Sequence, residues 1–184
     1  PNLLKQISRL TLEWEKPLSV EKILVTNGGM EAINLCLDSI TSRGDIIAIE
    51  SPTYHGILQS LESRGLTALE IKVNPDTGLC VNDLEMALAN NKVAACIFMP
   101  RCHNPTGSSM SEENKIRLVE LLGKLDIPLI EDDCLGELYF GSTKSYPAKA
   151  YDIYDNVLYC SSFSKTLAPG FRIGWVSAGK HHLN

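Results

Sequence analysis

The stretch VLYCSSFSKTLAPGFRIGWVS, residues 157–177, holds two short apolar runs separated by a polar loop. The runs, Val157–Cys160 and Arg172–Ser177, are rich in β-branched and aromatic residues and predict two strands. The loop between them carries three serines and Lys165, and Arg172 follows that lysine seven residues later. A lone lysine in a loop is usually solvated. A lysine among other cations and hydroxyl groups can act as an amine nucleophile, and serines with an arginine bind phosphate. This stretch therefore predicts a site with a reactive amine and phosphate-binding groups, in the loop between two strands.

The same alternation of strand-like and helix-like segments extends toward the N-terminus. Five more apolar runs predict strands, at Ile23–Thr26, Ile46–Ile49, Thr67–Val73, Ala94–Met99 and Ile127–Ile130. Between them, apolar residues recur at helical spacing, as in residues 33–40 and 118–125. The strands show little alternation of polar and apolar residues, which is typical of a mainly parallel sheet buried on both faces. The sequence therefore predicts a layered α/β fold in which helices cover a sheet.

Composition and charge exclude several classes of protein. The chain has 184 residues, a formal net charge of −5 and 44% hydrophobic residues, which is the composition of one ordinary globular domain. An acidic balance argues against a broad phosphate-binding face, so we expect that this chain itself contacts no nucleic acid. The longest apolar run, residues 93–100, is far shorter than the ~20 residues needed to span a bilayer, so no membrane partner is expected.

Six cysteines are spread along the chain without any C-x-x-C spacing. Several lie in apolar runs, which favours free buried thiols in a reducing compartment, and we therefore expect a cytoplasmic location. Cys102 and His103 are poorly spaced for zinc, so no metal site is expected. The chain opens on Pro1 rather than Met and shows no signal peptide, which predicts that it is a piece of a longer protein.

Three further loops follow predicted strands and carry unusual polar residues. Thr26–Glu31 contains two glycines ahead of a helix, which lets backbone N–H groups approach an anion closely. His103–Gly107 contains a rigid Asn-Pro-Thr-Gly turn that would hold the Asn104 amide at the edge of the sheet. Residues 131–133, Glu-Asp-Asp, end an apolar strand, and three carboxylates together suggest that one has a buried positive partner. Each loop alone is more often a plain turn, but ligands of parallel sheets bind where strands end.

Together the four loops describe a ligand with four features. An aldehyde would react with the amine of Lys165, a protonated ring nitrogen would meet Asp132, and a phenolic oxygen would meet the Asn104 amide. A phosphate would be bound by Gly29, Met30, Ser162, Ser164 and Arg172. Pyridoxal 5′-phosphate (PLP) has all four features and is the predicted cofactor.

These motifs resemble the large domain of fold-type-I PLP enzymes, in the class I/II aminotransferase family. They occur in the family's order and cover most of the chain: the Asn-Gly-Gly-Met loop, Ser51–Tyr54, His103–Gly107, residues 131–133 and Ser162–Arg172. The resemblance implies a three-layer α/β/α fold around a mainly parallel seven-stranded sheet with one antiparallel strand. It also implies that Lys165 bonds covalently to the cofactor's aldehyde and then moves a proton, and that Tyr54 stacks on the cofactor ring.

Two branches of the family share the motifs. One contains free-standing aminotransferases. The other contains the aminotransferase-like domains of MocR-type regulators of the GntR family, in which a winged-helix DNA-binding domain comes first. Four segments resemble the regulator branch more: Met30–Leu37, Ile49–Tyr54, Glu131–Leu138 and Ser162–Trp175. We therefore expect the cofactor- or effector-sensing part of a transcription regulator. The alternatives are the core of a catalytic aminotransferase acting on an amino acid, and a degenerate scaffold without cofactor.

The sequence departs from the family pattern after its pyridine-binding aspartate. The family usually has a tyrosine two or three residues further on, where Cys134 and Leu135 stand, and this argues against efficient transamination and fits a sensor. The resemblance further implies that residues 1–184 are a fragment of the large domain, without the DNA-binding and C-terminal small domains of the parent. The full-length protein is expected to be a homodimer that takes an amino-acid or amine ligand.

Overall fold

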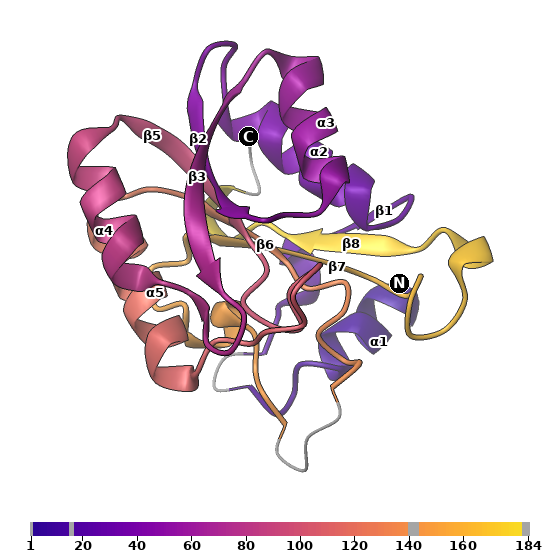
Figure 1. Cartoon of the computed structure of the whole chain (residues 1–184). Coiled ribbons are helices and arrows are strands. Elements are labelled where there is room, and N and C mark those ends of the chain that lie inside the picture. The colour runs from indigo at the N-terminus through magenta and orange to yellow at the C-terminus, as the bar shows by residue number, and fades with distance from the viewer. Residues whose placement is uncertain (1, 15–16, 140–143, 182–184) are drawn as a thin grey trace.

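The computed structural model describes residues 2–14, 17–139 and 144–181, and within them an eight-stranded sheet is covered by helices (Figure 1). The strands are β1 (Ile23–Thr26), β2 (Ile46–Ser51), β3 (Thr67–Asn74), β4 (Gly78–Leu79), β5 (Val93–Phe98), β6 (Leu129–Asp132), β7 (Val157–Ser162) and β8 (Gly174–Ser177). The α-helices are α1 (Asn2–Arg9), α2 (Gly29–Ile40), α3 (His55–Arg64), α4 (Val81–Asn90) and α5 (Glu112–Lys124). Short 3₁₀ helices are η1 (Val20–Lys22), η2 (Ala148–Tyr151), η3 (Pro169–Phe171) and η4 (Gly179–His181).

The order of the strands in space is β1-β8-β7-β6-β5-β2-β3-β4. β7, β6, β5, β2 and β3 are parallel neighbours, whereas β8 runs antiparallel to both β7 and β1. The predicted α/β class is therefore confirmed, and β8 is the antiparallel strand among the seven predicted ones.

The predicted number of strands is wrong by one. The chain turns back after β3, and the two-residue strand β4 pairs antiparallel with the end of β3, in the register Val73↔Leu79 and Asn74↔Gly78. Gly78 has φ +80°, a left-handed conformation that glycine adopts without strain. The chain can therefore turn tightly enough for β4 to pair with β3. The last strand also begins later than predicted, at Gly174, because Arg172 has a left-handed φ of 49°.

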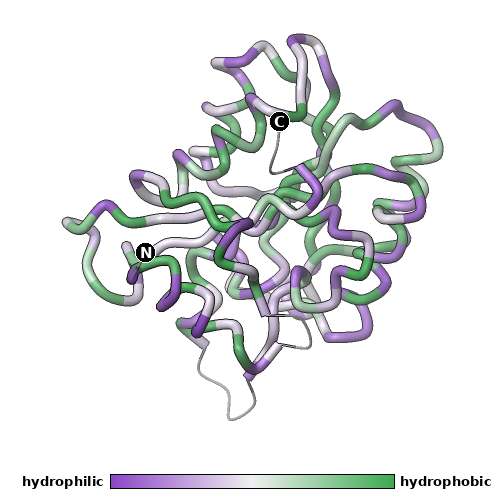
Figure 2. Tube along the Cα trace, turned by 180° about the vertical axis from the view of Figure 1, so that it is seen from behind, coloured by the Kyte–Doolittle hydropathy of each residue, from purple (hydrophilic) through white to green (hydrophobic). Residues whose placement is uncertain are grey.

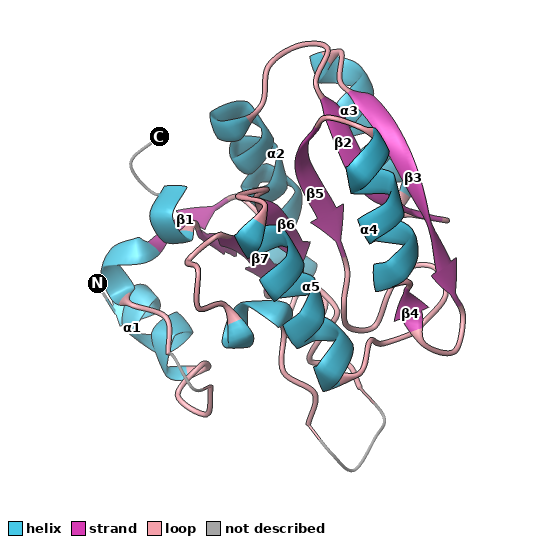
Figure 3. Ribbon diagram, turned by 90° about the vertical axis from the view of Figure 1, so that its left-hand side faces the viewer, coloured by secondary structure: helices cyan, strands magenta, loops and turns pink. Residues whose placement is uncertain are grey.

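Two apolar layers separate the sheet from its helices. α2 and α3 lie on one face and α4 and α5 on the other, as the side view shows (Figure 3). Along β2, Ile47 and Ile49 pack with α2 and α3, whereas Ala48 packs in the layer that contains residues of α4 and α5. This alternation follows from the two-residue repeat of a strand, and it buries both faces. Hydrophobic residues accordingly run through the middle of the molecule (Figure 2).

A third cluster joins the N-terminal segment to β7 and β8. Ile7 of α1 and Trp14 pack with Tyr159 and Trp175, and the rings of Trp14 and Tyr159 meet edge to face at 5.3 Å. Among the described residues, no helix is long and apolar enough to cross a membrane. The parallel strands β2, β5, β6 and β7 end at one edge of the sheet, and this edge positions the candidate site.

Candidate cofactor-binding site

All nine residues predicted from the sequence to bind the cofactor line one cavity of about 530 Å³ at this edge. They come from the start of α2, the loop before α3, the turn after β5, and the ends of β6 and β7 with the following loop. They are Gly29, Met30, Tyr54, Asn104, Asp132, Ser162, Ser164, Lys165 and Arg172. The tertiary structure thus brings together residues that are up to 143 positions apart, since Gly29 and Arg172 mark the two ends of the set.

One end of the cavity is suited to an anion. α2 begins at Gly29, and its first N–H groups are unpaired within the helix, as at every helix start. The guanidinium of Arg172 lies beside them, with Nη2 donating to the Asn27 carbonyl at 2.9 Å and Nη1 3.5 Å from Ser164 Oγ. A Cβ on Gly28 would lie 2.3 Å from Arg172 Nη2, so only glycine lets the arginine approach the helix start. Cationic, hydroxyl and backbone donors together fit a phosphate dianion.

The three carboxylates at the end of β6 have different partners. Asp133 forms a buried ion pair with Arg101, whose Nε donates to Oδ1 at 2.8 Å, and it also accepts from Tyr159 Oη at 2.7 Å. Glu131 accepts from the backbone N–H groups of Ala148 and Lys149, at 2.7 and 2.8 Å. Burial raises the pKa of Glu131 to about 7. Glu131 and Asp133 therefore stabilise the folded chain through buried contacts. The buried positive partner that the sequence predicted for one of the three carboxylates is Arg101.

Asp132 is the carboxylate that faces the cavity. It is 5% exposed and accepts a hydrogen bond from the Cys134 N–H at 3.1 Å. It forms no ion pair with a cation in the described part of the chain. Burial raises the pKa of Asp132 above its usual value. A buried carboxylate is costly unless a positive or hydrogen-bonding group meets it. Asp132 therefore fits a ligand that brings a cationic N–H to this point.

Two buried polar side chains, His103 and Glu50, support the turn that contains Asn104. His103 Nδ1 shares a hydrogen bond of 2.8 Å with Thr106 Oγ1, while its Nε2 lies 3.5 Å from a carboxylate oxygen of Glu50. Glu50 also accepts from the Met99 N–H at 2.7 Å. Burial raises the pKa of Glu50 to about 8 and lowers that of His103. Glu50 is therefore mostly protonated at neutral pH and adds little negative charge beneath the cavity.

Lys165 lies exposed in the loop after β7, which closes on itself through the Leu167 N–H and the Phe163 carbonyl at 3.0 Å. Tyr54 immediately precedes α3. A Cβ on Gly56 would lie 2.5 Å from the Tyr54 ring, so this glycine leaves space for the ring against the start of the helix. An exposed amine and a flat ring in one cavity suit a planar ligand that carries an electrophile.

Sequence reasoning missed several contributors to the site. Ile33, Met99 and Pro169 line the cavity, and Arg101 and Glu50 support it from beneath. A signal was present for Glu50, an acidic residue that ends an apolar strand. Cys134 and Leu135 line the cavity where the family usually has a tyrosine, and burial raises the pKa of the Cys134 thiol well above its usual value. Among the described residues, no group of three or more His, Cys, Asp or Glu side chains is placed to hold a metal ion.

The chain belongs to the aminotransferase class I and II family, whose model matches residues 1–183. It is 47% identical over 164 residues to the uncharacterized HTH-type transcriptional regulator YdcR of Escherichia coli, covering 89% of this chain and 35% of that protein. It superposes with a TM-score of 0.92 on an archaeal alanine:glyoxylate aminotransferase, 29% identical, over 100% of this chain and 47% of that one. It superposes with a TM-score of 0.90 on the α-aminoadipate aminotransferase LysN of Thermus thermophilus, 26% identical, over 98% of this chain and 46% of that one.

These comparisons confirm the family that the motifs indicated, and pyridoxal phosphate is the cofactor that the family implies. The LysN structure holds N-(5′-phosphopyridoxyl)-L-leucine, a derivative of that cofactor. The chain spans about a third to a half of the length of these relatives.

Proposed function

We propose that this chain is the PLP-binding part of a longer transcription regulator of the GntR/MocR type, in which the bound cofactor senses an amino acid or amine. The observation that carries the cofactor assignment is Asp132: a buried carboxylate without a cation partner in the described chain, facing a cavity lined at its other end by phosphate-type donors. A ligand with a pyridinium nitrogen and a phosphate satisfies both ends at once.

Different residues of the cavity would bind different parts of the cofactor. Arg172, Ser162, Ser164 and the start of α2 would bind its phosphate, and Asp132 would keep its ring nitrogen protonated. Asn104 would donate to its ring oxygen, and Tyr54 would cover one face of the ring. The amine of Lys165 would attack its aldehyde and later carry a proton to or from the bound amine. When bound, PLP supplies an electron-accepting ring conjugated to that carbon.

Two observations favour a regulator over an enzyme. The regulator YdcR is 47% identical, and Cys134 and Leu135 stand where the family usually places a tyrosine beside the ring oxygen. A phenol there assists turnover, whereas a sensor needs only a stable complex that responds to an amine. DNA would then be bound by another domain of the parent and not by this acidic chain.

The remaining proposals concern the whole protein. We infer that residues 1–184 are a fragment of the large domain of a longer parent, because the relatives are two to three times longer. That the parent is a homodimer is proposed from the family resemblance alone. A cytoplasmic location is supported by the six cysteines, which are all free. The second candidate function, a catalytic aminotransferase core, is favoured by one observation: the lysine, aspartate, asparagine and arginine set is complete in the cavity.

The experiment that tests the proposal is borohydride trapping of PLP on the chain. The chain is incubated with PLP, its visible spectrum is recorded, and borohydride reduction is followed by peptide mass spectrometry. We expect the label on the peptide that contains Lys165, its loss in Lys165→Ala, and its retention in Lys124→Ala, a control at an exposed lysine of α5. A label that persists in Lys165→Ala contradicts the site, and an absence of any visible band favours the degenerate scaffold.

A second experiment separates regulator from enzyme. The full-length parent loaded with PLP is mixed with single amino acids, and the spectrum of the cofactor and the binding of DNA from its own promoter are both followed. A ligand that changes DNA binding without net conversion of the amino acid supports the regulator. Multiple turnovers to an oxo acid in the presence of an acceptor support the enzyme.

A further inference from the structure

The loop after β5 brings Asn104 to the space that the nine predicted residues line, called here the cofactor cavity. At the base of this loop, the Met110 N–H donates to the Pro100 carbonyl at 2.8 Å. Nearer the tip, the His103 N–H donates to the Ser108 carbonyl, also at 2.8 Å. These two backbone hydrogen bonds fix the base of the loop.

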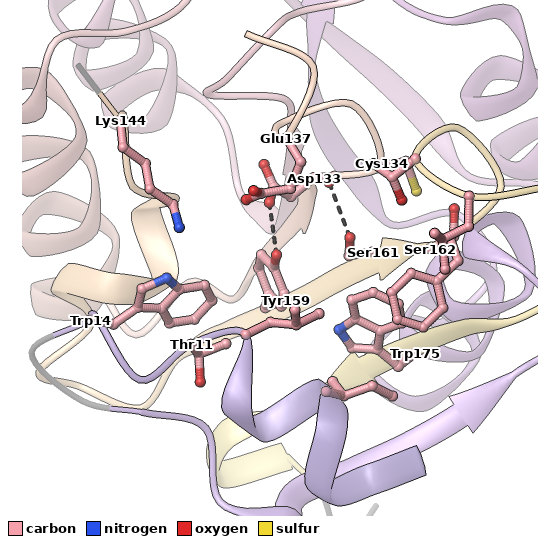
Figure 4. Close-up of a pocket in the computed structure, with 15 residues that line it drawn as sticks. Thr11, Trp14, Asp133, Cys134, Glu137, Lys144, Tyr159, Ser161, Ser162 and Trp175 are labelled. Carbon is pink, nitrogen blue, oxygen red and sulfur yellow. Dashed lines mark hydrogen bonds between the residues drawn. The ribbon is translucent and has the colours of Figure 1, made fainter. Parts of the chain in front are cut away.

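A buried ion pair also fixes the chain just before the turn. Arg101 lies two residues before His103, and its Nε donates to Asp133 Oδ1 at 2.8 Å. Asp133 in turn accepts from Tyr159 Oη at 2.7 Å, and Figure 4 marks this hydrogen bond. The chain therefore enters the turn from a segment that is held by buried contacts.

One threonine hydroxyl joins the side chains at the tip of the loop, which lies between His103 and Ser108. Thr106 Oγ1 lies 2.8 Å from His103 Nδ1 and 2.7 Å from Ser108 Oγ, and it accepts from the Ser108 N–H at 3.3 Å. A hydroxyl group accepts two hydrogen bonds and donates one, so these contacts use its whole capacity. The Gly107 N–H donates to the His103 carbonyl at 2.6 Å, whereas Asn104 forms no hydrogen bond of its own within the described part of the chain. The place of the Asn104 amide therefore depends on the residues that flank it.

The direction of the hydrogen bond between His103 and Thr106 follows from the other edge of the imidazole ring. His103 Nε2 is buried without a hydrogen bond, and an oxygen of the Glu50 carboxyl group lies 3.5 Å away. Burial raises the pKa of Glu50 to about 8, so at neutral pH this group is mostly protonated and offers no charged acceptor to an N–H at Nε2. Burial lowers the pKa of His103, so its ring is neutral and carries one N–H. That N–H would be buried and unpaired at Nε2, whereas at Nδ1 it donates to Thr106 Oγ1.

We propose that His103 is a positioning residue: its Nδ1–H donates to Thr106 Oγ1 and thereby fixes the tip of the loop, with the Asn104 amide at the cofactor cavity. This inference deepens the proposed function and rests on it, because Asn104 would donate to the ring oxygen of PLP. His103 is 2% exposed and is not among the residues that line the cofactor cavity, so it acts through the turn and not by contact with the cofactor.

The first test uses the cofactor-free chain. The ¹⁵N shifts of an imidazole ring distinguish a protonated nitrogen from an unprotonated one, and we expect the proton of His103 on Nδ1. Thr106 is only partly buried, so a matched pair of variants at this position should fold. Thr106→Val removes the acceptor and should lower the order parameter of the Asn104 backbone N–H below the value of rigid backbone, about 0.85. Thr106→Ser keeps the hydroxyl group and should keep the order.

The second test measures PLP affinity by absorbance titration. In His103→Asn the amide lies near the former place of Nδ1 and can still donate to Thr106, whereas in His103→Gln the same amide lies near the former place of Nε2. We expect His103→Asn to bind PLP about five-fold more tightly than His103→Gln, the gain typical of one net hydrogen bond. Thr106→Ser should bind more tightly than Thr106→Val by the same factor. In the Asn104→Ala background both differences should disappear, because His103 acts through Asn104.

The outcomes separate this proposal from the proposed function. Thermal melting establishes that each variant is folded, and the proton position in the wild-type chain needs no variant. The proposal is overturned if the proton of His103 lies on Nε2, if Thr106→Val leaves the order of Asn104 unchanged, if the two His103 variants bind PLP equally, or if their difference survives in the Asn104→Ala background. A wild-type chain that binds no PLP contradicts the proposed function instead, and the proton position and the order parameter then still decide whether His103 fixes the turn.

Discussion

Replacing Glu50 by glutamine should change how the stability of the chain depends on pH. Glu50 is 2% exposed, and burial raises its pKa from 4.5 to about 8. Between these two values the folded chain holds the proton and the unfolded chain releases it. Because the folded state binds more protons there, the free energy of unfolding must fall as pH rises through this range. Glutamine has nearly the same shape and can still accept the Met99 N–H, but it does not titrate.

The magnitude follows from proton linkage. A single group contributes at most about 1.4 kcal/mol for each pH unit within its window. From about pH 5.5 to about pH 7.5, the wild-type chain should therefore lose about 2–3 kcal/mol relative to Glu50→Gln. Glu131 and Asp132 also have raised pKa values, but both remain in the variant, so the difference between the two proteins isolates Glu50.

The assay is urea denaturation of the cofactor-free chain at several pH values, followed by circular dichroism. Glu70→Gln is the control, because Glu70 is an exposed glutamate on the neighbouring strand β3, opposite Ile49 in the register. We expect the control to follow the wild type and Glu50→Gln to show a shallower pH dependence, with the largest gain near pH 8. Parallel curves for wild type and Glu50→Gln would refute the burial of a protonated Glu50 beneath the cavity.

Three more predictions concern the site and its support. Asp132→Asn should stabilise the cofactor-free chain near pH 8, as urea denaturation would show. It should weaken PLP binding about ten-fold in an absorbance titration, because an amide offers no charge to a pyridinium. Unchanged PLP affinity would contradict the pairing of Asp132 with the ring nitrogen. Arg101→Met should lower the free energy of unfolding in urea by about 3–5 kcal/mol, because Asp133 is left buried without its cation. Adding Asp133→Asn should recover part of this loss. A loss below about 1 kcal/mol would argue against the buried ion pair. Gly28→Ala should lower the free energy of unfolding by about 1–3 kcal/mol, because φ is +92° and the new methyl group would meet the Arg172 guanidinium. The same change should weaken the binding of inorganic phosphate, measured by calorimetry. A folded variant with wild-type phosphate affinity would contradict the phosphate site at the start of α2.

Much of the fold could be predicted from local patterns. The apolar runs mark every long strand, and the helical spacing of apolar residues marks α2 and α5, because these patterns follow from the repeats of strand and helix. Ser111 caps the start of α5 and accepts a hydrogen bond from the Asn114 N–H at 3.2 Å. β4 could not be predicted, because a two-residue strand exists only through its pairing with β3.

The nine site residues could also be predicted, because loops that follow parallel strands must meet at one edge of the sheet. All nine line one cavity, while their binding of PLP and their roles toward it stay predictions. The supporting groups could not be found in this way. Arg101 and Glu50 are two charged residues among many in the sequence, and their burial depends on what the folded chain places around them.

The sequence by itself therefore determined the order of the elements and the edge at which the chemistry gathers. Only the tertiary structure decided which of the three adjacent carboxylates faces the cofactor cavity and which hold the fold. The reason is that alternation along β6 puts Asp132 on one face and Glu131 and Asp133 on the other, while the partners on each face come from distant segments. The environment of the buried Trp175 indole has the same origin, because α1, β7 and β8 make it together and no local pattern describes it.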